Sequence, residues 1–189
     1  PPLRNYLVTL LDKYRLDVLS RAFDAASDPS GVVEELISCG YISDASSSLI
    51  SFIETQGLSK RGIGALLGRL GSEAFLEDFT AHVFEKIRRR LEESDQPQHG
   101  QSEVEETSST NLSEPFVICK ENVFLSTLRT YLESFHIPGE AQQIERILHC
   151  FSAHFLPFFV SLPDEYKSGT TFTQELAFVL SYAVMMLNT

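Results

Sequence analysis

Tryptophan is absent from this 189-residue sequence, cysteine occurs only three times, and no apolar stretch is long enough to cross a bilayer. The longest apolar run, Leu176 to Leu187, is interrupted by Ser181, and we interpret it as a buried helix. Without tryptophan, the 14 phenylalanines must supply the large apolar anchors of a core. An odd, widely spaced set of cysteines is not a disulfide framework and predicts a reducing compartment. The three are Cys39, Cys119 and Cys150.

Positive charge is also scarce. The sequence has 15 lysines and arginines against 26 acidic residues, which gives a formal net charge of −11. Phosphate backbones and anionic lipid repel such a chain, which argues against nucleic acid as a direct partner. A protein partner with a basic or mixed face fits better. No secretory signal is visible, and the sequence starts at Pro1 rather than Met, so we expect it to be an excerpt from a longer protein.

Period-two alternation of useful length is missing, which argues against a sheet, whereas apolar residues recur at spacings of three and four nearly everywhere. In the first half these spacings predict a long helix from Leu3 to Phe23 and a short helix that ends near Gly40. A third helix is expected to be capped by Ser43 or Asp44 and to stop at Gly57, and a fourth to be capped by Ser59. A fifth helix is expected to run through Ile87 and to end at Arg88–Arg90. In the second half the spacings predict helices from Phe124 to Phe135, from Ala141 to Pro157, and from a capping box at Thr171 and Gln174 to Thr189.

Periodicity vanishes between about Glu92 and Pro115. This stretch is rich in Glu, Ser, Thr, Gln and Pro and has almost no large apolar residues. It cannot bury enough surface to offset the entropy of ordering, so we predict a flexible acidic insert. Its length suits a linker within the fold or between two halves.

Two local patterns suggest chemistry but lack its other requirements. The segment from Gly57 to Gly68 contains several glycines and a lysine, but it lacks the spacing of a phosphate-binding loop and follows no strand. Cys150 and His154 are four residues apart on one predicted helix and could face the same way. Two ligands are too few for zinc, and no third lies nearby in the sequence, so we predict no metal site. A nucleophilic pair would also need an orienting group and an oxyanion site.

The most informative constellation runs from Ile137 to Gln142. Pro138 and Gly139 end one helix and begin another, which places Glu140 in the first helical turn. The free amides at a helix N-terminus favour an ionised carboxylate there. Gly139 leaves room for another backbone to approach. By these physical arguments alone, an ordinary first-turn glutamate is the favoured explanation of Glu140.

Longer motifs in this part of the chain resemble a known family. The segment from Ser134 to Arg146 closely resembles the first signature of the Sec-seven domain, found in guanine-nucleotide exchange factors for Arf GTPases. Ala177 to Thr189 resembles the opening of its second signature. A weaker family pattern matches Phe23, Asp28-Pro29, Gly57-Leu58-Ser59-Lys60, Ile63-Gly64 and Leu67-Gly68. The similarity therefore runs in order from about Arg21 to the end, interrupted by the acidic insert.

The resemblance implies an all-α fold, a right-handed stack, or superhelix, of short helices with a disordered acidic insert. It divides the chain into an N-terminal flanking helix at 1–20, an N-terminal helical part of the exchange domain at 21–91, the insert at 92–120 and a catalytic helical part at 121–189. The second signature normally continues into an Asp-Leu-His-Asn run. We therefore expect the sequence to stop before the C-terminal helices of the family.

The resemblance also implies a mechanism. In this family a glutamate enters the nucleotide site of the GTPase, takes over the region of the magnesium ion and repels the β-phosphate. That role falls on Glu140, and the loop support falls on Pro138, Gly139 and Gln142. A hydrophobic groove that takes the two switch regions of the GTPase is implied for Phe178, Tyr182, Met185, Met186 and Asn188. No covalent bond is made or broken, and no cofactor or metal is implied.

Four residues depart from the family pattern. His136 stands where Arg is usual and Ile137 where Leu is usual, while Gln143 replaces Lys and Glu145 replaces Asp. These departures leave open a catalytically silent domain of the same fold that binds a GTPase as a scaffold. A general helical interaction domain is a third class, which the ordered signatures argue against.

The leading interpretation is an Arf exchange factor. Its partner would be an Arf-type GTPase, first GDP-bound and then nucleotide-free, and it would meet membranes only indirectly. The resemblance implies a cytoplasmic protein at the periphery of Golgi, endosomal or plasma membranes.

Overall fold

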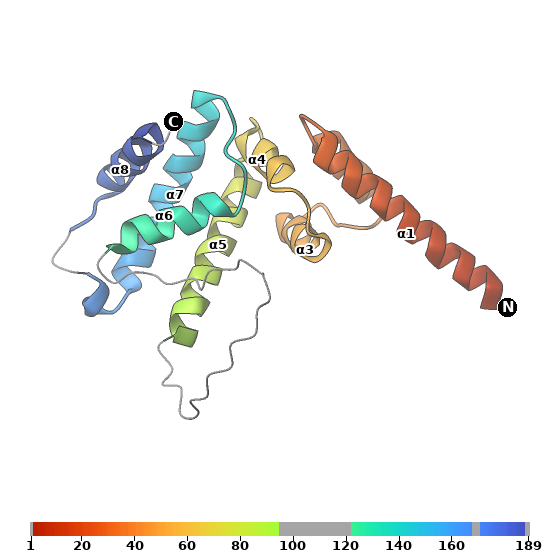
Figure 1. Ribbon diagram of the computed structural model, residues 1–189, viewed down its shortest axis with the longest axis horizontal. Helices are drawn as coiled ribbons and strands as arrows, with labels where there is room; N and C mark the ends of the chain where they lie inside the picture. The colour runs from red at the N-terminus through yellow and green to blue at the C-terminus, as the bar shows by residue number, and fades with distance from the viewer. Residues whose placement is uncertain (1, 95–121, 168–170, 188–189) are drawn as a thin grey trace, which may run out of the picture.

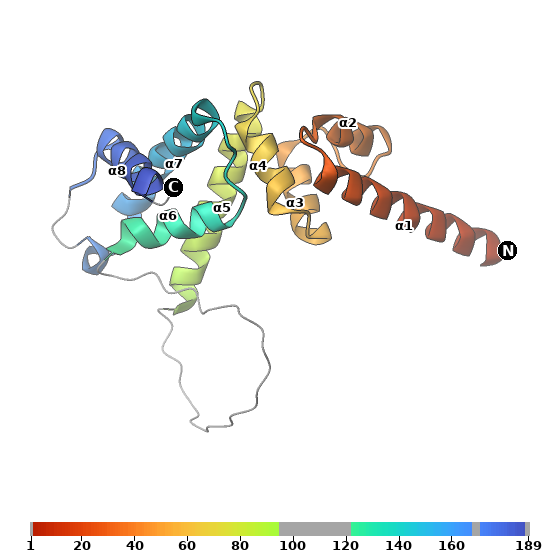
Figure 2. The same ribbon diagram turned by 45° about the horizontal axis from the view of Figure 1, so that its top comes forward.

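The computed structural model describes residues 2–94, 122–167 and 171–187, and all regular structure within these ranges is helical. The helices are α1 (Pro2–Ala25), α2 (Ser30–Ser38), α3 (Ser46–Gln56), α4 (Lys60–Gly68), α5 (Glu73–Ser94), α6 (Val123–Glu133), α7 (Ala141–Ser161), a 3-10 helix (Asp164–Tyr166) and α8 (Gln174–Leu187). Figures 1 and 2 show α5, α6 and α7 together in the body, with α8 against α7 and α1 projecting at the opposite end. The predicted all-α fold is confirmed.

Phenylalanines form the centre of the core, as their number and the lack of tryptophan predict. Phe84 of α5 lies with its ring centroid 5.6 Å from Phe151 and 5.4 Å from Phe158 of α7. Tyr131 of α6 is fully buried beside them, and its hydroxyl makes a 2.9 Å hydrogen bond with Thr80. Aromatic pairs at such distances add to the stability that buried area supplies. The core therefore ties α5, α6 and α7 into one unit.

Several helix ends follow the sequence signals, whereas the starts of α3 and α8 do not. Gly57 ends α3 in the left-handed conformation, at φ 63°, and the Ser59 hydroxyl caps α4 by accepting from the Gly62 amide. Neither Ser43 nor Asp44 caps α3, because Ala45 is the N-cap residue. At the start of α8, Thr173 rather than Thr171 is the cap, since its hydroxyl accepts from the Leu176 amide at 3.2 Å.

Pro157 does not end α7, contrary to the prediction. The helix continues through it to Ser161. A proline inside a helix costs about 3 kcal/mol because it lacks an amide donor and crowds the preceding turn. Beyond it, Phe158 and Phe159 are both buried in the core, and burying a phenylalanine side chain contributes about 1.5–3 kcal/mol. Packing of the last turn therefore offsets the cost of the proline.

Helix α5 extends further than the arginines predict. It runs to Ser94, so Arg88–Arg90 lie inside the helix and not at its end. Arg88 and Arg89 form ion pairs with Glu85, one turn earlier. Residues 92–94 therefore belong to a helix and not to the predicted insert. The rest of that insert, 95–120, lies outside the described residues.

Helix α8 is not the buried helix that its apolar composition predicts. Only Ala177 and Ser181 are buried, while most of its large apolar side chains are exposed. The reason is geometric, because α8 makes its main helix contact with α7 on one side. No helix in the described residues combines the length and the hydropathy that crossing a membrane would require.

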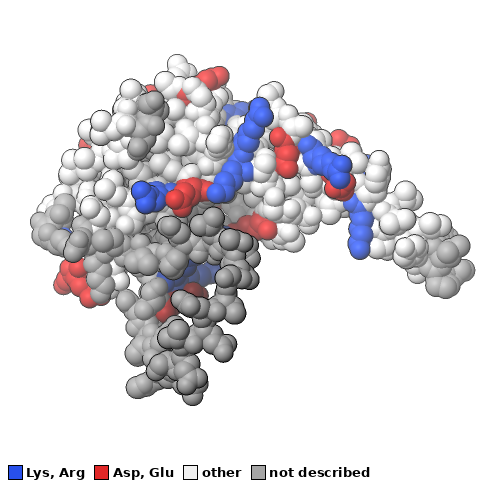
Figure 3. All heavy atoms as spheres, viewed as in Figure 1, with Lys and Arg blue, Asp and Glu red and all other residues white. Residues whose placement is uncertain are grey.

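Helix α1 confirms the predicted long first helix, but it packs on the rest of the chain mainly through its second half. Leu19 and Phe23 are buried, whereas the apolar residues of its first half are exposed. Phe23 packs on Gly62 of α4, where a Cβ atom would meet the phenyl ring at 2.4 Å. On the face drawn in Figure 3, positive and negative side chains alternate in small groups among uncharged atoms. This face offers no broad basic surface to a polyanion.

Candidate functional site

The connection from α6 to α7, residues 134–140, rests on helix α4. The His136 amide donates a 2.7 Å hydrogen bond to the Lys60 carbonyl at the start of α4. One turn further along α4, Gly64 has no side chain, and a Cβ there would lie 1.7 Å from the His136 carbonyl oxygen. Backbone thus packs directly on backbone, which only glycine permits. The loop is fixed by a helix that lies about 70 residues away in sequence.

Apolar side chains fix the same loop from its inner side. Phe135 is buried, with its ring 5.3 Å from Tyr131 and 6.3 Å from Phe79. Ile137 is half-buried against the core, so the substitution of Ile for the usual Leu keeps an apolar contact. Pro138 is half-buried as well, whereas Gly139 is exposed. The loop therefore passes from a rigid anchor to a solvent-facing edge within four residues.

Glu140 stands at that edge. It is the N-cap residue of α7 with extended backbone, not a first-turn residue as predicted, and its carbonyl accepts from the Gln143 and Ile144 amides. Its side chain makes no capping hydrogen bond and is exposed. We find no hydrogen bond or ion pair from this carboxylate to any residue in the described ranges. The charge is thus held on a fixed support, with no partner among the residues that the structure describes.

The first turns of α7 are fastened to the end of α4. Arg146 donates to the Gly68 carbonyl, and the Gln143 side chain packs where a Cβ on Gly68 would lie, at 2.7 Å. Gln143 is therefore a packing residue here, which accounts for its departure from the usual lysine. Glu73 lies close by, and hydrogen bonds from the Glu73 and Gly71 amides, with the nearby Arg146 charge, lower its pKa.

These supports were only partly visible in the sequence. Glycines four residues apart, such as Gly64 and Gly68, are a general signal of close packing on one helix face, and close packing is confirmed at both positions. Their partners on the loop and on α7 were not predicted, since no spacing links α4 to residues more than 70 positions later. In the sequence Arg146 is only the last residue of the family motif, and its hydrogen bond to the Gly68 carbonyl is visible only in the structure.

The residues predicted to line a groove lie on α8. Phe178 is half-buried, with its ring 5.6 Å from His149 of α7 and 6.3 Å from Tyr182. Met185 is half-buried against the core, Tyr182 is 37% exposed and Met186 is 61% exposed. The structure thus joins four of these residues into one apolar strip beside α7. The fifth, Asn188, lies outside the described residues.

Gln142 is exposed in the first turn of α7, next to Glu140. The α8 strip contacts α7 through the Phe178 and His149 rings. A hollow of about 410 Å³ lies elsewhere, between the C-terminal ends of α5 and α7, and is lined by Arg88, Leu91, Glu92, Ser161, Leu162, Pro163 and Tyr166. It includes none of the predicted site residues.

Comparison with known proteins identifies the region that carries this loop. Residues 116–189 match the Sec7 domain family model. Among curated proteins, the ARF guanine-nucleotide exchange factor GNL2 of Arabidopsis thaliana is 39% identical over 64 residues, 34% of this chain and 4% of that protein. The human brefeldin A-inhibited guanine nucleotide-exchange protein 1 is 40% identical over 68 residues, 35% of this chain and 3% of that protein.

A longer alignment reaches the N-terminal helices. The brefeldin A-inhibited guanine nucleotide-exchange protein 1 of Arabidopsis thaliana is 29% identical over 162 residues, 85% of this chain and 7% of that protein. The chain thus spans less than a tenth of the length of these relatives. The resemblance carried by the loop and by α8 is confirmed: residues 116–189 match the Sec7 domain family model, and the relatives named above are Arf or brefeldin A-inhibited guanine-nucleotide exchange proteins.

Proposed function

We propose that this protein is a guanine-nucleotide exchange factor for Arf-type GTPases and that Glu140 is its carboxylate finger. The observation that carries the proposal is the state of Glu140, an exposed carboxylate with no partner among the described residues, at the edge of a loop anchored by α4. Ser, Thr, Asp and Asn are the residues that usually cap a helix with their side chains, and the glutamate at this N-cap position makes no such bond. The Sec7 match and the names of the relatives supply the class of partner.

The proposed mechanism is electrostatic. Glu140 enters the nucleotide site of a GDP-bound Arf-type GTPase and opposes the β-phosphate, and the complex then passes through a nucleotide-free state. Two unit charges 4 Å apart interact by roughly 4 kcal/mol at an effective dielectric constant near 20. Such a repulsion lowers nucleotide affinity on the order of a thousandfold. No covalent bond of a substrate changes in this scheme.

The α8 strip has a separate role in the proposal. Phe178, Tyr182, Met185 and Met186 supply apolar binding surface for the GTPase switch regions, together with Asn188. Pro138, Gly139 and Gln142 hold the shape of the loop and leave room beside Glu140. The activity would place the protein at the cytoplasmic surface of Golgi, endosomal or plasma membranes, reached through the GTPase.

The test is GDP release from a panel of Arf-type GTPases. Glu140→Gln removes the charge at nearly constant shape, and Glu140→Lys reverses it. We expect release to slow on the order of a hundredfold or more with Gln and further with Lys, while both variants still bind the GTPase. Glu145→Gln is the matched control, because Glu145 is also exposed near the start of α7. It should exchange as the parent does.

Two results would count against the proposal. Release by Glu140→Lys at the parental rate would exclude the carboxylate finger. A parent chain that binds Arf-type GTPases but never accelerates release would support the alternative, a catalytically silent scaffold of the same fold.

A further inference from the structure

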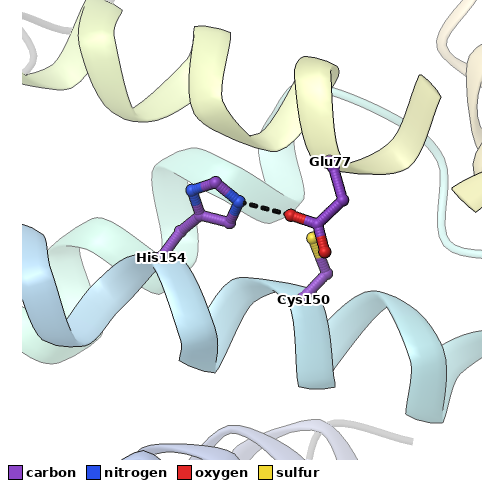
Figure 4. Close-up of side chains that lie close together, drawn as sticks. All are labelled: Glu77, Cys150 and His154. Atoms are coloured by element: carbon purple, nitrogen blue, oxygen red, sulfur yellow. Dashed lines mark hydrogen bonds and ion pairs between the residues drawn. The ribbon is translucent and has the colours of Figure 1, made fainter. Parts of the chain in front are cut away.

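Three potential metal ligands meet between α5 and α7, away from the proposed exchange site. Figure 4 shows Glu77 on α5 facing Cys150 and His154 on α7. The Nε2 atom of His154 lies 2.7 Å from Oε2 of Glu77, and one ligand atom from each of the three residues lies within 4.8 Å of the other two. The sequence offers only the Cys150–His154 pair. The fold supplies the missing third ligand from 73 positions earlier.

The three side chains sit at different depths. Cys150 is buried, with its Sγ atom 3.4 Å from the Thr80 hydroxyl. His154 is partly buried, and its ring stacks on Phe84 with centroids 6.0 Å apart. Glu77 is mostly exposed, at 60% of its side chain. An ion could therefore approach from solvent past the carboxylate and bind the sulfur inside, with a water molecule on its outer side.

We propose that Glu77, Cys150 and His154 bind a Zn²⁺ ion, with water as the fourth ligand. Sulfur, imidazole nitrogen and carboxylate oxygen together form a donor set that zinc accepts, whereas Mg²⁺ and Ca²⁺ require oxygen ligands. Zinc–ligand bonds of about 2.0–2.3 Å place neighbouring ligand atoms of a tetrahedron about 3.5 Å apart. The His154–Glu77 separation of 2.7 Å is shorter than that value and no separation exceeds 4.8 Å, so side-chain rotations such as that of the exposed Glu77 could reach the tetrahedral arrangement.

Binding would exchange a proton for the metal. Burial raises the pKa of the Cys150 thiol to about 12, so the metal-free side chain keeps its proton at neutral pH. Zinc binds the thiolate, and the released proton passes to solvent. Without the metal, His154 and Glu77 form a hydrogen bond to each other, and the buried Cys150 thiol lies beside them.

The position of the cluster indicates what the ion would do. Cys150 lies ten residues along α7 from Glu140, which is about 15 Å at the rise of an α-helix. The ion would thus take no part in nucleotide exchange. It would instead join α5 to α7, the two helices on which the aromatic core is built, and so stabilise the support of the loop.

Co²⁺ is the probe for the first experiment, because a cobalt–thiolate bond gives an absorption band that oxygen and nitrogen ligands do not give. The full chain is reduced with a phosphine that does not chelate metals and is titrated with Co²⁺. We expect one Co²⁺ per chain, a thiolate-to-cobalt band and loss of that band on addition of Zn²⁺. The band should vanish in Cys150→Ser and persist in the matched controls Cys39→Ser and Cys119→Ser.

The other two ligands are tested by affinity. His154→Gln and Glu77→Gln should each weaken Co²⁺ binding by more than about tenfold. Even the loss of a residue that only hydrogen-bonds to a metal ligand typically lowers metal affinity by about that factor. Zn²⁺ should raise the melting temperature of the parent and leave that of Cys150→Ser unchanged. If Cys150→Ser fails to fold, His154→Gln at its partly exposed position takes its place in both measurements. A parent without the thiolate band, or a band that Cys150→Ser or a folded His154→Gln retains at parental affinity, would overturn the proposal.

Discussion

The carbonyl oxygen of His136 lies against Gly64 so closely that a Cβ atom at position 64 would be 1.7 Å away from it. This one contact joins the loop that carries Glu140 to helix α4. It also explains why the side chain of His136 is free to differ from the family pattern. The backbone of His136 positions the loop, because its amide donates a hydrogen bond to the Lys60 carbonyl and its carbonyl packs on Gly64.

Gly64→Ala should therefore slow nucleotide exchange although Glu140 itself is unchanged. The added methyl group must push the loop away from α4, which we expect to lower the free energy of unfolding by about 1–3 kcal/mol and to slow GDP release on the order of tenfold or more. Urea unfolding measures the change in stability, and GDP release at a saturating concentration of the exchange factor measures the change in rate. Gly31→Ala is the matched control, because nothing lies within 4 Å of its added Cβ. Parental exchange by Gly64→Ala would refute the proposed role of this contact.

Met186→Ala tests the α8 strip. Because Met186 is 61% exposed, its truncation leaves no large cavity, and the fold should survive. We expect affinity for the Arf-type GTPase to fall about tenfold, as for one apolar contact residue, while the exchange rate at saturation stays close to that of the parent. Val160→Ala, at 63% exposure on the far end of α7, serves as the control. Titration of GTPase binding by calorimetry gives both affinities, and equal values for the two variants would contradict the assignment.

Glu54→Gln tests a surface ion pair between α3 and α5. The Glu54 carboxylate bonds to Lys86 at 2.6 Å and to His82 at 2.9 Å, and these two bonds, Lys86 first, hold its pKa below the usual 4.5. A lowered pKa contributes stability that is present above pH 4.5 and is lost as the pH falls through the folded-state value. Since the side chains are more than a third exposed, solvent screening limits the contribution to under about 1 kcal/mol.

At pH 7 the Glu54→Gln variant should therefore unfold at slightly lower urea concentration than the parent. The difference should shrink as the pH is lowered below 4.5 and as salt is added. Glu35→Gln, on the exposed face of α2, should show neither trend. A difference between Glu54→Gln and the parent that grows on acidification would show that the pair does not act as described.

Local signals in the sequence were sufficient where a residue acts on its own neighbours. Gly57 and Ser59 end and begin helices as predicted, because the left-handed conformation and the hydroxyl cap depend on a few adjacent residues. Pro157 was misjudged because the burial of Phe158 and Phe159, which offsets its cost, depends on residues distant in sequence, such as Phe84 of α5 and Phe172. The apolar composition of α8 likewise predicted a buried helix. How much of a helix is buried depends on how many helices surround it, and α8 packs mainly on α7.

Contacts between distant segments were the part that the sequence could not supply. Glu77 completes a set of three ligands with Cys150 and His154 only because α5 and α7 pack side by side. Gly64 and Gly68 suggested close packing but not its partners. The motif around Glu140 was recognisable because it is contiguous, while the absence of an internal partner for its carboxylate required the structure.

The one-sided packing of α8 has a consequence for its local stability. A helix held mainly by one neighbour can detach while α5, α6 and α7 stay folded, so its amide hydrogens should exchange with solvent through a partial opening. The amides of α7 should instead exchange only when the whole core unfolds. A partner that covers the outer face of α8 would remove the detached state from the ensemble, and its affinity would include the free energy of closing that helix.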